Sequence, residues 1–99
     1  MKALWNGETI ASSDETIVIE GNHYFPAESV DKDCLDKSDL VTTCGWKGDA
    51  DYYHLKQGDK TVENAAWYYA TPLPNSITRV GKDYTNYIAF YPNVVDITD

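Results

Sequence analysis

The sequence is poor in cysteine and lacks long apolar runs, and each shortage excludes a class of protein. Its two cysteines, Cys34 and Cys44, allow one disulfide at most, whereas small secreted domains usually have four or more cysteines. No segment approaches the about 18 consecutive apolar residues that span a membrane, and the N-terminus has no secretory leader pattern. These features predict a cytoplasmic protein with free thiols and no membrane partner.

Basic residues are also scarce. Eight Lys and Arg residues stand against sixteen Asp and Glu residues, so the formal net charge is −8. The seven lysines and Arg79 are scattered singly, and no basic patch is present that could attract a phosphate backbone. The sequence therefore predicts no nucleic-acid partner.

The chain is short, and it is rich in apolar and aromatic residues. It has 99 residues, of which 42% are hydrophobic and 13% aromatic, which is too apolar for a disordered chain. This length supports one core, so residues 1–99 are predicted to form a single domain. A two-domain enzyme, a full dinucleotide-binding fold and a (β/α)₈ barrel are all too large.

Turn signals at short, regular intervals indicate a β-rich fold. Asn6-Gly7 is typical of a tight hairpin, and short helical turns are predicted at 26–29 and 74–79. Residues 30–39 are predicted to be a solvated strand edge or a loop. The predicted strands are 3–5, 8–11, 16–20, 23–25, 40–44, 52–55, 60–69, 86–91 and 94–97. The predicted fold is all-β, a small twisted sandwich or half-open barrel with one or two short helical turns.

Several segments, in this order, resemble the family called domain of unknown function 427 (DUF427). These segments are Trp5-Asn6-Gly7, the stretch from Glu20-Gly21 to Tyr24-Phe25-Pro26, Cys44-Gly45-Trp46-Lys47-Gly48, Glu63-Asn64-Ala65-Ala66-Trp67-Tyr68-Tyr69 and Ala89-Phe90-Tyr91. The resemblance implies an Mss4-like β fold and a nucleotidyltransferase-like label, without an established activity. Mss4-like proteins often bind zinc through paired Cys-x-x-Cys motifs. This sequence has no such motif, so neither a metal nor a cofactor is expected.

The segment Trp46-Lys47-Gly48 is the first candidate for a ligand-binding site. A glycine at this turn permits a tight bend or the close approach of a ligand. Lys47 could offer a cation to an anionic substrate, or act as a base if burial lowers its pKa. The alternative is that Lys47 is a solvent-facing turn residue and Trp46 an anchor of the core.

The second candidate is a set of aromatic and polar side chains on two strands. Trp67 and Tyr69 share a strand face because side chains alternate, and Tyr53 is predicted to join them around a pocket. Glu63 and Asn64 are predicted to supply polar contacts to the same ligand. The alternative is that the aromatic residues fill the core and the polar pair lies on the surface.

Metal and nucleophile chemistry receive less support. Asp49 and Asp51 alternate on a strand and could hold a divalent ion, but a solvated strand start explains them better in so acidic a chain. The spacing of the cysteines and histidines matches no zinc motif; these residues are His23, Cys34, Cys44 and His54. No catalytic residue is assigned.

Three functions of different classes remain open at this point. The first is the binding of a small molecule in an aromatic-lined pocket, which the aromatic and amide residues favour. The second is an enzyme that acts on a nucleotide or another phosphorylated compound, in which Lys47 contacts the anion and a carboxylate, Glu63 or Asp51, assists. The third is a protein-interaction or chaperone-like module. Edge strands also allow a homodimer, although nothing in the sequence selects one.

Overall fold

The computed structural model describes residues 1–99, with nine strands, one α-helix and two short 3-10 helices. The strands are β1 (Lys2–Trp5), β2 (Glu8–Ser12), β3 (Ile17–Ile19), β4 (Asn22–Tyr24), β5 (Leu35–Cys44), β6 (Gly48–Gln57), β7 (Lys60–Tyr68), β8 (Ile88–Phe90) and β9 (Asp96–Thr98). The helical elements are η1 (Ala27–Ser29), η2 (Lys32–Cys34) and α1 (Pro74–Val80). None of these helices has the length and apolar character needed to cross a membrane.

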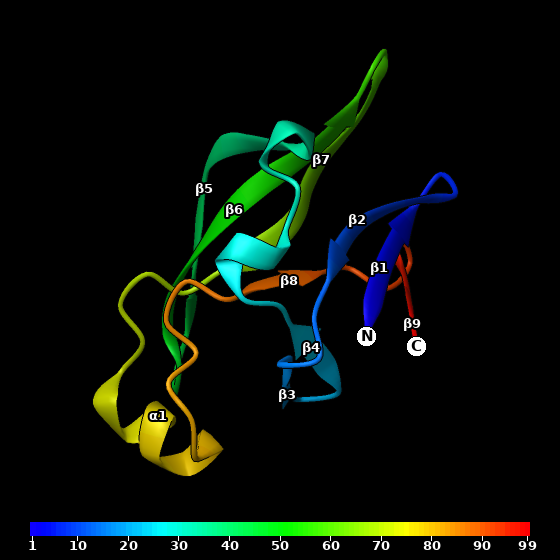
Figure 1. Ribbon diagram of the computed structural model, residues 1–99. Helices are drawn as coiled ribbons and strands as arrows, with labels where there is room; N and C mark the ends of the chain where they lie inside the picture. Colours follow the sequence, from blue (N-terminus) through cyan, green and yellow to red (C-terminus); the bar gives the residue numbers. More distant parts are fainter.

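The strands form three antiparallel sheets (Figure 1). The largest has the order β5-β6-β7-β8, the second has the order β2-β1-β9, and β3 pairs with β4 in a separate hairpin. Two backbone hydrogen bonds of 2.8 Å between Phe25 and Ile88 join the chain after β4 to β8. The two termini lie side by side because β1 pairs with β9, and α1 lies at the end of the large sheet where β5 turns into β6 (Figure 1). The three sheets form a sandwich-like fold without a closed barrel.

Glycine and asparagine shape the first hairpin as the sequence predicts. Asn6 and Gly7 have φ values of 51° and 80° between β1 and β2. Two consecutive positive φ values match the right-handed twist of the flanking strands. The same geometry recurs at Glu20 and Gly21, with φ values of 53° and 82°, and places Glu20 at the tip of the β3–β4 hairpin.

Two groups of buried side chains pack against β6 and β7. Tyr52 and Trp67 are cross-strand partners and belong to an aromatic group, whereas Tyr53 and Tyr68 pack against a mainly aliphatic group. The alternation of side chains along each strand separates the two groups. We call the first of these the aromatic cluster; it comprises Ile17, Ile19, Tyr24, Ala50, Tyr52, Trp67, Tyr69, Tyr84 and Ala89.

The mostly β fold and the short helical turns confirm the sequence prediction, but two strands are longer than expected. Residues 35–39 belong to β5, although mostly exposed, because Leu35 and its neighbours pair with Leu55 and the adjacent residues of β6. Strand β6 begins at Gly48 rather than at Tyr52. The first residues of β6 alternate between buried positions and more exposed ones. The acidic residues Asp49 and Asp51 occupy the more exposed positions, so the start of the strand reads as polar in the sequence. The turn predicted at 74–79 is α1, which begins at Pro74 and ends at Val80, where Gly81 with φ 89° caps it.

Candidate functional site

Lys47 lies in the turn between β5 and β6, and its side chain points into the protein. The residue is only 6% exposed. Its ammonium donates a hydrogen bond to the Glu20 carboxylate at the tip of the β3–β4 hairpin. The same ammonium lies 5.2 Å from the ring centroid of Tyr69 and 5.4 Å from that of Trp46. The charge of Lys47 is therefore already compensated within the protein.

The protonation of Lys47 follows from this environment. Burial alone would lower its pKa, but the hydrogen bond to Glu20, together with Tyr24 and Tyr69, raises the pKa above its ordinary value of 10.5. The lysine consequently remains an ammonium ion at neutral pH. This argues against Lys47 as a general base, which must first lose its proton.

The aromatic cluster beneath Lys47 is a filled interior. Trp67 donates a hydrogen bond from Nε1 to the Tyr24 hydroxyl at 3.0 Å, and the two rings meet edge to face. Burial raises the pKa of Tyr69 to about 12, with a further increase from Tyr24 and an opposing effect of Lys47. Neither Trp67 nor Tyr69 lines any pocket of the structure. Tyr69 contacts the Lys47 ammonium, and Trp46 packs against the cluster to which both residues belong.

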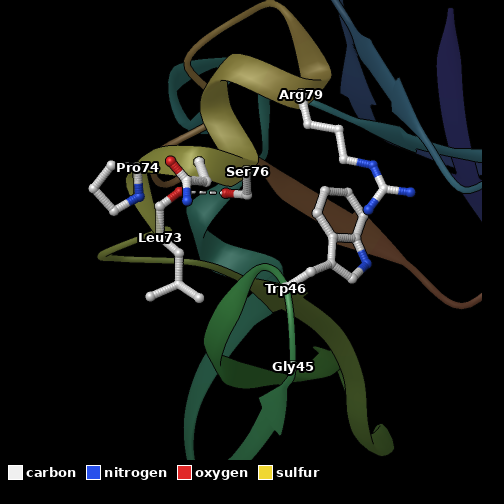
Figure 2. Close-up of a pocket in the computed structure, with 7 residues that line it drawn as sticks. Gly45, Trp46, Leu73, Pro74, Ser76 and Arg79 are labelled. Carbon is white, nitrogen blue, oxygen red and sulfur yellow. Dashed lines mark hydrogen bonds between the residues drawn. The ribbon is translucent and has the colours of Figure 1, made fainter.

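A pocket of about 470 Å³ opens beside Trp46, between the β5–β6 turn and α1 (Figure 2). The Arg79 guanidinium carbon lies 4.5 Å from the centroid of the Trp46 ring, so the two planar groups meet at one side of the pocket. Leu73 is exposed and forms another wall. We call this space the Trp46–Arg79 pocket; its lining residues are Gly45, Trp46, Leu73, Pro74, Asn75, Ser76 and Arg79.

Local sequence fixes the walls of the Trp46–Arg79 pocket. Pro72 and Pro74 restrict the backbone on either side of Leu73, and the Leu73 N–H donates to the Lys47 carbonyl at 2.9 Å. Ser76 is buried, and its hydroxyl bonds both to the Leu73 carbonyl at 2.6 Å and to the Tyr84 hydroxyl at 2.7 Å. These bonds hold the start of α1 against the aromatic cluster. Hydrogen bonds therefore hold the backbone of Leu73 and of the start of α1, which form this side of the pocket.

A second pocket, of about 610 Å³, shares Gly45 and Leu73 with the first. We call it the acidic pocket because Asp49 and Asp51 both line it, on one face of β6 as the sequence predicts. Asp49 accepts a hydrogen bond from the Thr43 hydroxyl at 2.8 Å, and Asp51 lies 3.8 Å from the Lys37 ammonium. The structure contains no group of three His, Cys, Asp or Glu side chains that could hold a metal ion. A metal role for these two carboxylates would need further ligands from elsewhere.

The remaining residues of the predicted ligand site lie away from Trp46. Tyr53 faces the opposite side of the sheet and stacks on Tyr68 at 5.0 Å between ring centroids. Asn64 accepts a hydrogen bond from the Ser38 hydroxyl, and its backbone N–H donates to His54 Nδ1 at 3.0 Å. Its positive φ of 55° lies opposite an irregularity in the pairing of β6 with β7.

The structure thus divides the predicted site into two parts. Trp46, Lys47 and Gly48 lie together above Trp67 and Tyr69. Tyr53, Glu63 and Asn64 lie elsewhere, with Glu63 exposed on β7.

The thiols and imidazoles occupy separate positions. Cys34 is buried and Cys44 is partly buried, and neither forms a disulfide. Burial and the neighbouring Asp31 raise the pKa of the Cys34 thiol, which disfavours the nucleophilic thiolate. His23 shares a hydrogen bond with the Thr16 hydroxyl at 2.9 Å. Cys34 and His23 therefore contact neighbouring residues rather than a shared site.

Sequence reasoning missed Arg79 and Glu20. Arg79 is the only arginine in the chain, and arginine stacks on aromatic faces more readily than lysine does, so its residue type was a usable signal. Glu20 lies 27 residues from Lys47, and no local pattern links the two.

Comparison with known proteins identifies the family. The profile described as Domain of unknown function (DUF427), with the label NTP_transf_9, matches residues 1–99. No curated protein matches the sequence. Because the match spans the whole chain, this protein belongs to the DUF427 family.

Proposed function

We propose that residues 1–99 act as one binding domain, which takes up a small molecule in the Trp46–Arg79 pocket. The observation that carries the proposal is the exposure of Trp46. Trp5 and Trp67 are 4% and 8% exposed, whereas Trp46 is only partly buried and lines a pocket. A large aromatic side chain that lines a pocket next to an arginine is a typical feature of a ligand site.

The chemistry of the walls favours a planar, anionic ligand. The indole ring offers a flat apolar surface, and Leu73 and Pro74 add further apolar area. Arg79 forms no salt bridge with any Asp or Glu of the chain, so its fork of N–H donors is free for a carboxylate or phosphate group. The volume of about 470 Å³ lies within the range of small-molecule sites.

Lys47 has an indirect role in this proposal. Its side chain bonds to Glu20 and its carbonyl accepts from the Leu73 N–H, so it holds one wall of the pocket in place. Tyr69 contacts the Lys47 ammonium, and Trp67 bonds to Tyr24 in the cluster against which Trp46 packs. Substitution of these three residues would therefore affect folding together with binding.

A thermal-shift screen tests the proposal. The panel contains benzoate, indole-3-acetate, nicotinate, nucleotides with and without Mg²⁺, sugar phosphates and quaternary amines. A ligand at 100 times its Kd adds roughly 2.7 kcal/mol to the free energy of unfolding, which is readily detected in a domain of this size. We expect planar carboxylates or phosphates to raise the Tm, and Trp46→Ala and Arg79→Gln to abolish the increase.

Matched control substitutions separate binding from stability. Lys82→Gln removes an exposed positive charge just beyond α1, and Val18→Ala removes an exposed apolar side chain from β3. Both controls should keep the ligand-induced increase in Tm. The proposal would be wrong if no planar anion raised the Tm, or if the increase persisted in Trp46→Ala.

A further inference from the structure

Strand β5 has an open outer edge. It is ten residues long, and its only neighbour in the sheet is β6. No backbone hydrogen bond connects it to any other segment. An irregularity in its pairing between Lys37 and Val41 interrupts the edge, and there the Ser38 carbonyl accepts a hydrogen bond from the Lys37 ammonium while the Leu40 N–H donates to the Ser38 hydroxyl. The regular open edge is therefore residues 41–44, which pair with β6 without a shift. Figure 1 shows β5 at the margin of the large sheet. Residues 40–43 are all exposed and carry no charge.

Most of the other sheet edges are blocked or short. The far edge of the large sheet is closed by the hydrogen bonds between Phe25 and Ile88. The edge of β2 is engaged by the Asp31 N–H, which donates to the Ile10 carbonyl at 2.8 Å. Strands β3 and β9 have three residues each. The outer edge of β7 is also unpaired over residues 60–63, because β8 pairs only with Ala66, Trp67 and Tyr68, but no pocket lies beside those residues. Strand β5 is thus the open edge that borders a pocket.

The acidic pocket lies directly beside this edge. Val41 pairs with Asp51 and Thr43 pairs with Asp49 across β5 and β6, and all four residues line the pocket. A strand added outside β5 would lie roughly 10 Å from β6, at two inter-strand spacings. A long basic side chain from that strand could extend over Val41 or Thr43 and place its charge near Asp49, which has only the Thr43 hydroxyl as a partner, or share Asp51 with the Lys37 ammonium.

We propose that the outer edge of β5 binds an extended peptide segment by strand addition, with a Lys or Arg side chain seated in the acidic pocket. Main-chain hydrogen bonds supply affinity in this mode of recognition, and a pocket for alternate side chains supplies specificity. The net charge of −8 also steers basic partners toward the protein. A second copy of this chain would bring Asp36 and Asp39 of its own β5 to the same edge, so charge favours the basic peptide.

Three capped, fluorescein-labelled peptides test the proposal by fluorescence anisotropy at low salt. The first is acetyl-Thr-Ser-Thr-Val-Lys-Val-Thr-Ser-Thr-amide, and the second has Glu in place of Lys. The third is the Lys peptide with methyl groups on backbone nitrogens along both of its edges, so that neither edge can pair with β5. We expect the Lys peptide to bind at least about tenfold more tightly than each of the others. The double variant Asp49→Asn/Asp51→Asn should lose most of the preference for Lys over Glu.

A control variant, Asp14→Asn/Asp99→Asn, removes the same charge at exposed positions away from β5 and should retain that preference. The peptide comparisons use the unaltered protein, so they do not depend on the folding of any variant. The proposal is overturned if the Lys peptide shows no saturable binding at about 1 mM, or if all three peptides bind equally. It is also overturned if sedimentation velocity shows a dimer that the Lys peptide does not dissociate, because the edge would then bind a second copy in place of the peptide.

Discussion

At the scale of single residues, Lys47 and Glu20 form an unequal ion pair. The Lys47 side chain is 7% exposed, whereas that of Glu20 is 54% exposed. Removing the lysine leaves a carboxylate that water can solvate, but removing the carboxylate charge leaves an ammonium ion inside the protein. The two substitutions should therefore differ in cost.

We predict that Lys47→Met lowers the free energy of unfolding by about 1–2 kcal/mol, the scale of a hydrogen bond to a charged group. Glu20→Gln should lower it by about 2–3 kcal/mol, because it uncouples a buried charge. Urea denaturation of both variants measures the difference, with Lys82→Met as an exposed control expected near zero. The reverse order of the two losses would contradict a buried, charged Lys47.

The tyrosines near Lys47 predict loss of stability at alkaline pH. Burial raises the pKa of Tyr69 from 10.0 to about 12, and the pKa of Tyr24 is also raised, mainly by burial. A group with a raised pKa in the folded state stabilises the protein fully below its unfolded pKa, and this contribution is lost as pH rises. The free energy of unfolding should therefore fall between about pH 10 and pH 12.

Urea titrations at several pH values measure this alkaline decrease, and Tyr69→Phe should make it less steep because the substitution removes one ionisable hydroxyl. The higher pKa of Lys47 acts in the same direction, so the decrease should remain in part. Stability that stayed constant over this range would show that these hydroxyls ionise as freely as in the unfolded chain.

At the scale of elements, the β5–β6 turn depends on the backbone of Gly48. Its φ of +107° is one that side-chain-bearing residues rarely adopt, and a Cβ there would meet Leu73 Cγ at 3.5 Å. Gly58, in the β6–β7 turn, has φ +58° and open space around it. The first conformation lies outside the left-handed helical region, and the second lies within it.

We predict that Gly48→Ala lowers the free energy of unfolding by about 2–3 kcal/mol and Gly58→Ala by about 1 kcal/mol. Chemical denaturation of the two variants tests the difference, because the substitution is identical and only the backbone conformation changes. Equal losses would mean that the β5–β6 turn relaxes without strain.

Local patterns predicted much of the element structure but less of the site. The Asn6-Gly7 hairpin, the helix that begins at Pro74 and the shared face of Trp67 and Tyr69 all follow from rules that act within a few residues. The sequence pattern groups Tyr53 with Trp67, but Tyr52 is the cross-strand partner of Trp67, because strand register depends on pairings between distant segments. The Trp46–Arg79 contact joins positions 33 residues apart, so it emerges only when α1 folds back onto the β5–β6 turn.

At the scale of the whole molecule, charge repulsion is the dominant electrostatic feature. The chain has a net charge of −8 and only two salt bridges. Repulsion among excess like charges destabilises a folded chain and is screened by salt. We predict that the Tm rises as NaCl increases from low to moderate concentration, as measured by calorimetry. A falling Tm would show that the salt bridges outweigh the repulsion.

The most direct test of ligand binding beside Trp46 is an NMR titration that follows the indole N–H signals of the three tryptophans. Trp67 donates its indole N–H to Tyr24 inside the aromatic cluster, and Trp5 lies in the aliphatic core, so each reports on a separate region. Trp46→Phe assigns the third signal. On titration with the planar anion that gives the largest thermal shift, the Trp46 signal should move to saturation while the other two stay nearly fixed. An unmoved Trp46 signal, or a change confined to Trp5 or Trp67, would contradict a ligand site in the Trp46–Arg79 pocket.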